Sequence, residues 1–322
     1  MMIMNELLDL KDKKILYELD LCSRESNSEI AKKVKLSKDV VTYRIKELEK
    51  NGFIKGYYAI IDFSRLGFFS MRIYLKFLDV DLDKEKEIID YLVNNKKVLF
   101  VARTYGYSDL TFGPLVKDIY EFEEFYNEFK KVFKEYITNE KISIYTRVSH
   151  FHRAYLLDKK FDDSKPETFG DGPIIKHDDT DLNILKYLAN NARIPLVDIS
   201  QKLNIPVRTV AYRIKNMEKN KIIQGYRFVF DFNLISYKYY KIDFYLKNTS
   251  KINEIRNYCR KYPNIINLSQ SIGGADIEFF MEVKDKEQFL EIINDFRKKF
   301  QEIRSWEYFE FEKYYKLKYF PD

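Results

Sequence analysis

The sequence has little of what metalloenzymes and disulfide-stapled secreted proteins require. Its 322 residues include 2 cysteines and 3 histidines. Cys22 and Cys259 lie far apart without metal-site spacing, so we expect both to be small buried residues of a reducing compartment. No Gly-rich phosphate loop, metal-ligand motif or nucleophile with a nearby base occurs. We therefore expect no enzyme activity, no cofactor and no metal.

Long apolar runs are also missing. No stretch reaches the roughly 18 apolar residues that a membrane-spanning helix needs, and residues 1–14 become acidic and basic too early for a secretory signal. We expect a cytoplasmic protein that contacts no membrane. The 45% apolar and 33% charged composition is typical of folded proteins, and the net charge of +6 is too small to identify a polyanionic partner.

What the sequence does contain is an internal repeat. Asp12 to Leu16 aligns with Asp181 to Leu185, and the offset of 169 residues (181 minus 12) also relates Tyr43 to Tyr212. A weaker match pairs residues 106–109 with 273–276. Because a fixed offset over a long window is hard to obtain by chance, the chain is one module written twice.

The first segment of each copy has the pattern of three helices. In copy one, Asp9 and Asp12 suit the start of the first helix. A short second helix is expected over residues 26–34, and a tight turn leads to Ser37, the N-cap of the third. The third helix ends before Gly52, which supplies the left-handed residue after a helix.

The third helix is predicted to bury one face and expose the other. Val41, Ile45 and Leu48 form an apolar stripe at i, i+4 and i+7. The remaining positions carry groups that suit phosphates and base edges. We predict DNA contacts from Ser37, Lys38, Asp39, Thr42, Tyr43, Arg44 and Lys46 in copy one, and from Arg208, Thr209, Tyr212, Arg213 and Lys215 in copy two.

A β-strand pattern over residues 53–62 follows and predicts a wing, which completes the layout of a winged helix-turn-helix. In copy two, Pro206 replaces the capping Ser37, and Arg208 replaces Asp39, so the two helices should not read the same bases. Alternatives stay open at this point. Arg44 and Arg213 either bind phosphate or pair with a carboxylate, and the whole polar face is either a DNA surface or merely solvated.

The second segment of each copy alternates strand and helix patterns. Strands are expected over 71–80, 98–105, 109–116 and 142–148, with helices over 84–95 and 119–136, and residues 241–311 repeat this order. The order βαββαβ predicts a ferredoxin-like sheet with both helices on one face. The other face is rich in aromatics, so we expect a second such domain to cover it.

Together these patterns predict an α+β fold of two tandem copies, each a winged helix-turn-helix followed by a ferredoxin-like domain. Residues 159–176 contain two prolines and two glycines among charged residues, which is typical of a linker. The expected boundaries are 1–65 and 177–234 for the winged helix-turn-helix units, 69–156 and 238–322 for the βαββαβ domains, and 157–176 for the linker.

Nearly the whole chain resembles the Lrp/AsnC family, twice. The resemblance rests on the motifs Leu36-Ser37, Tyr43-Arg44-Ile45 and Gly52 to Tyr57, followed by βαββαβ. It implies operator binding by the helix-turn-helix, and a RAM domain that dimerises through its sheet and senses a small molecule such as an amino acid. Pairing within the chain and pairing with a second chain are both compatible with the linker. An internal pair predicts an imperfect palindromic operator.

The resemblance also implies an effector site at the turn between the two middle strands. Its residues here are Gly106, Asp109, Gly273, Gly274 and Asp276. The family commonly has an aromatic before the aspartate, where this sequence has Ser108 and Ala275. The alternative is a hairpin glycine with a turn-capping aspartate, although two successive glycines leave backbone N–H groups that suit a carboxylate.

The predicted function is that of a sequence-specific regulator of transcription that binds double-stranded DNA. Siroheme decarboxylases are similar at the level of the fold, and His150, His152 and Arg153 are the only cluster that such an enzyme activity would have. A protein-only partner of related regulators is the third class. Siroheme binding and a gel-shift assay at low salt distinguish the three.

Overall fold

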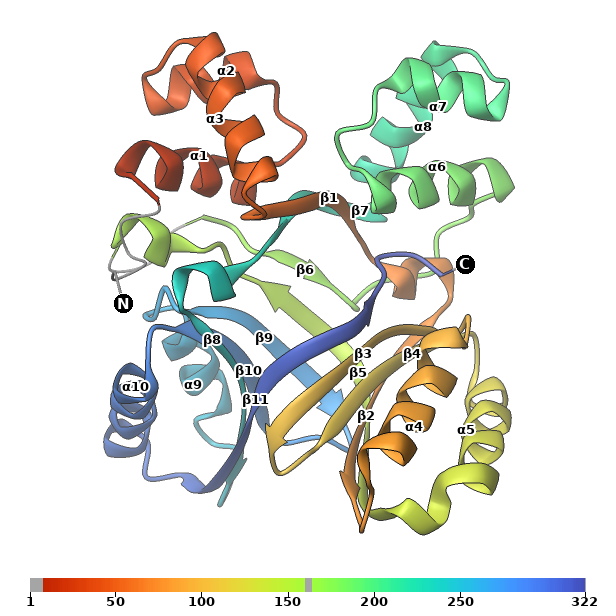
Figure 1. Ribbon diagram of the computed structural model, residues 1–322, viewed down its shortest axis with the longest axis vertical. Coiled ribbons are helices and arrows are strands. Elements are labelled where there is room, and N and C mark those ends of the chain that lie inside the picture. The colour runs from red at the N-terminus through yellow and green to blue at the C-terminus, as the bar shows by residue number, and fades with distance from the viewer. Residues whose placement is uncertain (1–7, 160–163, 322) are drawn as a thin grey trace.

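The computed structural model describes residues 8–159 and 164–321, in which the two copies have the same element order (Figure 1). Each helix-turn-helix unit consists of three helices, one strand and a 3-10 turn. In copy one these are α1 (Leu10–Leu21), α2 (Asn27–Val34), α3 (Lys38–Lys50), β1 (Ile54–Ile61) and η2 (Phe63–Leu66). In copy two they are α6 (Asp179–Asn190), α7 (Leu196–Leu203), α8 (Val207–Lys219), β7 (Ile223–Phe230) and η5 (Phe232–Ile235).

The second segments fold as predicted into βαββαβ units. The first comprises β2 (Phe69–Phe77), α4 (Leu82–Asn94), β3 (Val98–Gly106), β4 (Leu110–Val116), α5 (Ile119–Phe133), η3 (Lys134–Tyr136) and β5 (Ile137–His150). The second comprises β8 (Lys238–Leu246), α9 (Ile252–Cys259), β9 (Ile265–Ile272), β10 (Ile277–Val283), α10 (Lys286–Lys299) and β11 (Ile303–Leu317).

The two four-stranded sheets close into one eight-stranded antiparallel barrel. The strand order is β2-β4-β3-β11-β8-β10-β9-β5, and β5 pairs again with β2 to complete the ring. The seams between the copies are the β3–β11 and β5–β9 pairs. The expected covering of each aromatic sheet face by the other copy is thereby confirmed, and it occurs within one chain.

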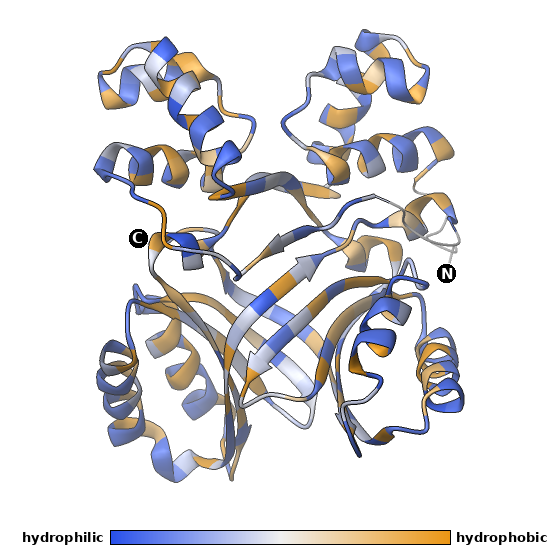
Figure 2. Cartoon of the chain, turned by 180° about the vertical axis from the view of Figure 1, so that it is seen from behind, coloured by the Kyte–Doolittle hydropathy of each residue, from blue (hydrophilic) through white to orange (hydrophobic). Residues whose placement is uncertain are grey.

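The outer helices pack on the outside of the barrel. Their inward stripes are apolar, as in Phe289, Ile292 and Phe296 of α10, and their outward sides are polar (Figure 2). One apolar cluster lies between α4, α5 and the first sheet, and another lies between α9, α10 and the second sheet. Each copy therefore has its own hydrophobic core, which lies between its two outer helices and the outer face of its sheet.

Both helix-turn-helix units stand at the same end of the barrel (Figure 1). Their buried residues form a single cluster that contains Ile15 of copy one and Ile184 of copy two. The strand predicted for the wing over residues 53–62 is present as β1. It pairs antiparallel with β7 of the other copy, with Tyr57 opposite Phe228, so the two wings form one ribbon between the units.

The segment predicted as a linker is partly structured. Turn η4 (Ala154–Leu157) ends at the first residue of the predicted linker, and strand β6 (Glu167–Phe169) within the linker pairs with β5 of the barrel. Of the two cysteines, Cys259 is buried as expected, whereas Cys22 at the end of α1 is only half-buried. No helix within the described ranges combines the length and apolar character that crossing a membrane requires.

Candidate nucleic-acid interface

Helix α3 leaves four polar or aromatic side chains free on one face. Ser37 caps the helix by accepting a hydrogen bond from the Val40 N–H (3.3 Å), while the predicted stripe is buried. Tyr43 has 65% of its surface exposed, which is unusual for so large a ring. The exposed residues without a side-chain hydrogen bond or ion pair in the described structure are Lys38, Asp39, Tyr43 and Lys46.

Helix α8 has the corresponding face. It starts after Pro206 without a side-chain cap, as the sequence predicts, and buries Val210, Ile214 and Met217. Tyr212 is 70% exposed, in the same place as Tyr43. The exposed residues of this helix that lack a side-chain partner among the described residues include Arg208, Tyr212 and Lys215.

The two arginines in these helices are held by carboxylates. Arg44 Nη1 lies 2.8 Å from Asp9 Oδ2 and 2.8 Å from Asp12 Oδ1, the two residues that form the capping box of α1. Arg213 makes the same pairs with Asp178 and Asp181 at 2.9 Å. The geometry favours the structural alternative, in which each arginine joins the third helix of its unit to the first. Phosphate contact by either arginine stays a prediction.

The two threonines differ from the free residues. Thr42 Oγ1 donates to the Lys38 carbonyl (2.8 Å) and accepts from Asn27 Nδ2 (3.0 Å). Thr209 is half-buried in the first turn of α8. These contacts place Thr42 at the packing surface between α2 and α3 and leave its hydroxyl less available to a base than the exposed side chains are.

A pseudo-twofold axis relates the two units. The Ser23 N–H donates to the Tyr226 carbonyl (2.8 Å), and at the offset of 169 residues the Ala192 N–H donates to the Tyr57 carbonyl (3.0 Å). These reciprocal hydrogen bonds tie each unit to the strand of the other copy. The exposed faces of α3 and α8 are thus fixed relative to one another by the β1–β7 ribbon and the shared core.

The aspartates of the predicted effector site cap strand ends. Asp109 Oδ2 accepts from the Phe77 N–H (2.9 Å), and Asp276 Oδ2 accepts from the Leu246 N–H (2.7 Å). The two aspartates thus accept the same backbone hydrogen bond at equivalent positions of the two copies. This observation favours the turn-capping alternative.

The glycines of these turns approach the opposite copy closely. A Cβ on Gly106, whose φ is +144°, would lie 2.4 Å from the Tyr308 carbonyl oxygen of β11. A Cβ on Gly273, with φ of +83°, would lie 2.6 Å from the Ile142 carbonyl oxygen of β5, and one on Gly274 would overlap Glu278. Glycine is therefore required at the barrel seams for packing, independent of any ligand.

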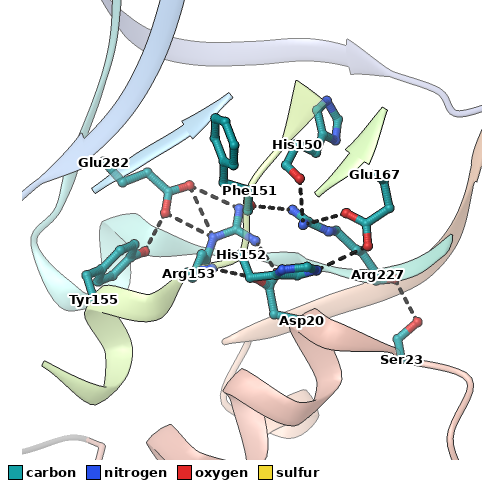
Figure 3. A network of polar contacts seen from close by, with 10 residues as sticks. All are labelled: Asp20, Ser23, His150, Phe151, His152, Arg153, Tyr155, Glu167, Arg227 and Glu282. Carbon is teal, nitrogen blue, oxygen red and sulfur yellow. Dashed lines mark hydrogen bonds and ion pairs between the residues drawn. The ribbon is translucent and has the colours of Figure 1, made fainter. Parts of the chain in front are cut away.

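His152 and Arg153 belong to a buried polar network, which His150 joins through its backbone carbonyl (Figure 3). Arg153 bridges Asp20 of α1 (Nη1 to Oδ1, 2.7 Å) and Glu282 of β10 (Nε to Oε2, 2.9 Å). It thereby joins the first helix-turn-helix unit to the barrel strand of the second copy. We name Asp20, Arg153 and Glu282 the charged joint.

The rest of the network surrounds Glu167 of the linker strand. His152 Nε2 lies 3.1 Å from Glu167 Oε1, and Arg227 Nη2 lies 2.8 Å from Glu167 Oε2. Burial, and then the charge of Arg227, lowers the pKa of His150 to about 3, so this imidazole is neutral at physiological pH. The His152 and Arg153 side chains are engaged within the protein, and the His150 ring packs against Phe169, so these residues form a structural cluster rather than an open site.

A second buried network lies inside the barrel, and the sequence analysis missed it. Lys241 is fully buried, contacts Asp243, and lies 3.0 Å from Glu278 Oε2. Copy one supplies Lys141, whose Nζ lies 3.1 Å from Asp243 Oδ2, and two hydroxyls, with Tyr107 OH 2.8 Å from Asp243 and Tyr145 OH 3.0 Å from Glu278. The barrel interior at the interface between the copies is therefore filled by paired charges and aromatic rings.

The described residues contain no group of three or more His, Cys, Asp and Glu side chains placed to hold a metal ion. The faces of α3 and α8 that carry Tyr43 and Tyr212 are exposed to a large partner. Lysine, arginine and tyrosine on such faces can contact phosphates and base edges in a DNA groove.

Comparison with known proteins agrees with this geometry. A winged helix-turn-helix DNA-binding family model matches residues 8–55 and again residues 177–224. An HTH-type transcriptional regulator of Pyrococcus furiosus is 32% identical over 133 residues, which cover 41% of this chain and 84% of that regulator. The HTH-type transcriptional regulator FL11 of Pyrococcus horikoshii is 24% identical over 119 residues, 36% of this chain and 79% of that protein.

Solved structures of the siroheme decarboxylase NirDL match both copies together. The siroheme decarboxylase NirDL superimposes with a TM-score of 0.63 and 14% sequence identity, covering 96% of this chain and 93% of that one. At this identity the match concerns the fold alone, namely two copies closed on each other in one chain. By sequence, the chain belongs to the Lrp/AsnC family of HTH-type transcriptional regulators and carries the family's module twice.

Proposed function

We propose that this protein is a sequence-specific, double-stranded DNA-binding regulator of transcription. The observation that carries the proposal is the pair of exposed faces on α3 and α8, whose lysines, arginine and tyrosines have no partner within the described structure. Tyr43 and Tyr212 are 65% and 70% exposed at the same position of the two units. Rings this exposed contribute little to the core, so core packing does not account for them. Both helices occupy the position of the recognition helix, which enters the major groove.

The pseudo-twofold arrangement of the units sets the form of the operator. Two recognition helices related in this way contact half-sites that are inverted relative to each other and separated by about one helical turn or a multiple of it. Because the exposed residues of α3 and α8 differ, we propose an imperfect palindrome. One chain supplies both helices.

Fluorescence anisotropy of a labelled duplex tests this function. We expect binding that weakens steeply as salt increases, because lysine contacts with phosphate release counterions. A Tyr43→Ala, Tyr212→Ala double variant should bind more weakly while unfolding at the same temperature, since neither ring packs in the core. If the wild-type chain binds no duplex even at low salt, the protein-only partner hypothesis gains support instead.

Modulation by an amino acid stays a prediction of the family resemblance. Both turn aspartates cap strand ends and the turn glycines pack against the barrel seams, so these residues are explained without a ligand. Calorimetric titration of the protein with individual amino acids tests the prediction. A measurable heat that disappears on changing Asp276→Asn, without loss of folding, would support an effector site there.

Siroheme decarboxylation is the competing function, because the fold of NirDL covers nearly the whole chain. Such an enzyme requires proton donors and basic groups that are open to its substrate. Here the His152 and Arg153 side chains are buried and held by Glu167, Asp20 and Glu282. We therefore propose no enzyme activity, and an absorbance shift on mixing the protein with siroheme would contradict this.

A further inference from the structure

The two copies are complementary rather than interchangeable. At the position equivalent to the charged joint, copy two has Ala189 for Asp20 and Phe320 for Arg153, with offsets of 169 and 167 residues. The partner position changes in the same way, since Leu115 in copy one corresponds to Glu282. Phe320 packs in the shared core together with Ala189. One joint is charged and the other is apolar.

This difference favours pairing of copy one with copy two. If copy two paired with a second copy two, Phe320 would replace Arg153, and the buried carboxylate of Glu282 would lose its cation. Inside the barrel, the strand register places Phe311 at the position of Tyr145, so Glu278 would also lose the hydroxyl that hydrogen-bonds it. A buried charge without a partner costs several kcal/mol. The two recognition helices of one chain thus form a fixed, unequal pair.

The recognition helices have some exposed residues in common. Tyr43 and Lys46 of α3 correspond to Tyr212 and Lys215 of α8 at the offset of 169 residues. All four are exposed. These shared residues predict similar contacts to both half-sites.

The first turn of each helix, however, carries opposite charges at one position. Asp39 on α3 corresponds to Arg208 on α8. Both side chains are exposed, and within the described structure neither has an ion pair or hydrogen bond that would explain its charge. Residues in the first turn of a recognition helix are those that contact base edges.

We propose that the operator departs from two-fold symmetry at the base pair that faces Asp39 in one half-site and Arg208 in the other. Arginine donates two hydrogen bonds to guanine O6 and N7, whereas aspartate accepts from the cytosine amino group. The strand contacted by Arg208 therefore carries guanine, and the equivalent strand of the other half-site carries cytosine. This inference rests on the DNA-binding function proposed above.

Selection from a random duplex pool with the full chain tests the inference. We expect an inverted repeat with guanine and cytosine at the two equivalent positions. Exchanging either base pair should weaken binding roughly five- to hundredfold, the range of one direct base contact. Asp39→Arg should convert the selected site to guanine in both halves, and Arg208→Asp should convert it to cytosine in both halves.

Lys46→Ala and Lys215→Ala are the matched controls, because they remove one charge from each helix at a shared position. Each should lower affinity without changing the selected base at the unequal position. Asp39→Asn provides a second variant should Asp39→Arg lower the melting temperature, and its expected preference is adenine, which asparagine recognises through N6 and N7.

The outcomes separate this inference from the proposed function. A wild-type site with the same base in both halves, or an unchanged site for Asp39→Arg, overturns the inference and leaves DNA binding intact. A wild-type chain that enriches no sequence and binds no duplex overturns both.

Discussion

Neighbouring residues of α3 differ in role, one suited to DNA contact and the other to packing of the helices. Lys46 is exposed and has no side-chain partner among the described residues, whereas Arg44, two positions earlier, is held by Asp9 and Asp12. A free lysine on a recognition helix contributes affinity through phosphate, and its loss changes the salt dependence of binding. A paired arginine contributes to the packing of α3 on α1.

Lys46→Ala should therefore weaken binding to all duplexes and reduce the slope of log K against log salt by about 1. Arg44→Ala should leave that slope unchanged and lower the free energy of unfolding by up to about 1 kcal/mol, because the ion pair is partly exposed. Anisotropy titrations across a salt series and urea unfolding measure the two effects. Equal slopes for Lys46→Ala and the wild type would remove Lys46 from the interface.

The sequence predicted the faces of these helices, because a periodicity of 3.6 separates buried from exposed positions. It could not predict partners that lie elsewhere in the chain. The carboxylates that pair with Arg44 are 35 and 32 positions away in the sequence. The Thr42 hydroxyl accepts a hydrogen bond from Asn27, which lies on another helix. For this reason the predicted residues include both free and engaged side chains.

At the scale of elements, the charged joint connects α1 to strand β10. Burial alone would raise the pKa of Asp20, but the charges of Arg227 and Arg153 outweigh it, so the pKa lies below its ordinary value. A carboxyl whose pKa is lowered in the folded state stabilises the fold above its unfolded pKa of about 3.9. That stability is lost as pH falls through the folded pKa.

Asp20→Asn should therefore lower the free energy of unfolding near pH 7 by about 3 kcal/mol, because Arg153 loses one of its two carboxylates in a buried site. The loss should shrink as pH falls below about 4, where the carboxyl of the unfolded wild-type chain begins to take up a proton, and vanish below the folded pKa of Asp20. Urea unfolding between pH 3 and pH 7 measures both. A constant difference between variant and wild type over this range would contradict the ionised state of Asp20.

Strand β8 shows why the barrel network was missed. Tyr240, Ile242 and Phe244 face the outer helices, which leaves Lys241 and Asp243 on the other face. Alternation normally assigns such charges to solvent. The sequence also predicted that another domain covers this face, and the two expectations together would have placed Lys241 and Asp243 in the interface.

Lys241→Met should destabilise the protein by about 3 to 5 kcal/mol, because Glu278 would lose its buried cation and Asp243 would keep only Lys141. Thermal unfolding followed by circular dichroism measures the effect. Lys238→Met on the same strand is the control, since that lysine is exposed and its ion pair with Glu310 is at the surface. If both variants unfold at the same temperature, Lys241 does not neutralise the barrel carboxylates.

At the scale of the whole molecule, the repeat in the sequence predicted two copies of one α+β module, and the structure confirms it. The sequence left open whether the copies pair with each other or with a second chain. That choice depends on pairs such as Phe309 opposite Gly106 and Tyr57 opposite Phe228, which join residues more than 150 positions apart. Local patterns carry no information on such pairs, so the pairing of β1 with β7 could not be predicted either.

Hydroxyl-radical footprinting of a selected operator, at a known number of chains per duplex, is the most direct test of the account. One 38.9 kDa chain per duplex should protect two segments on the same face of the DNA, with centres about 10 base pairs or a multiple of that apart. A single protected segment per chain, or protection that appears only with two chains bound, would contradict a chain that presents both recognition helices to one operator.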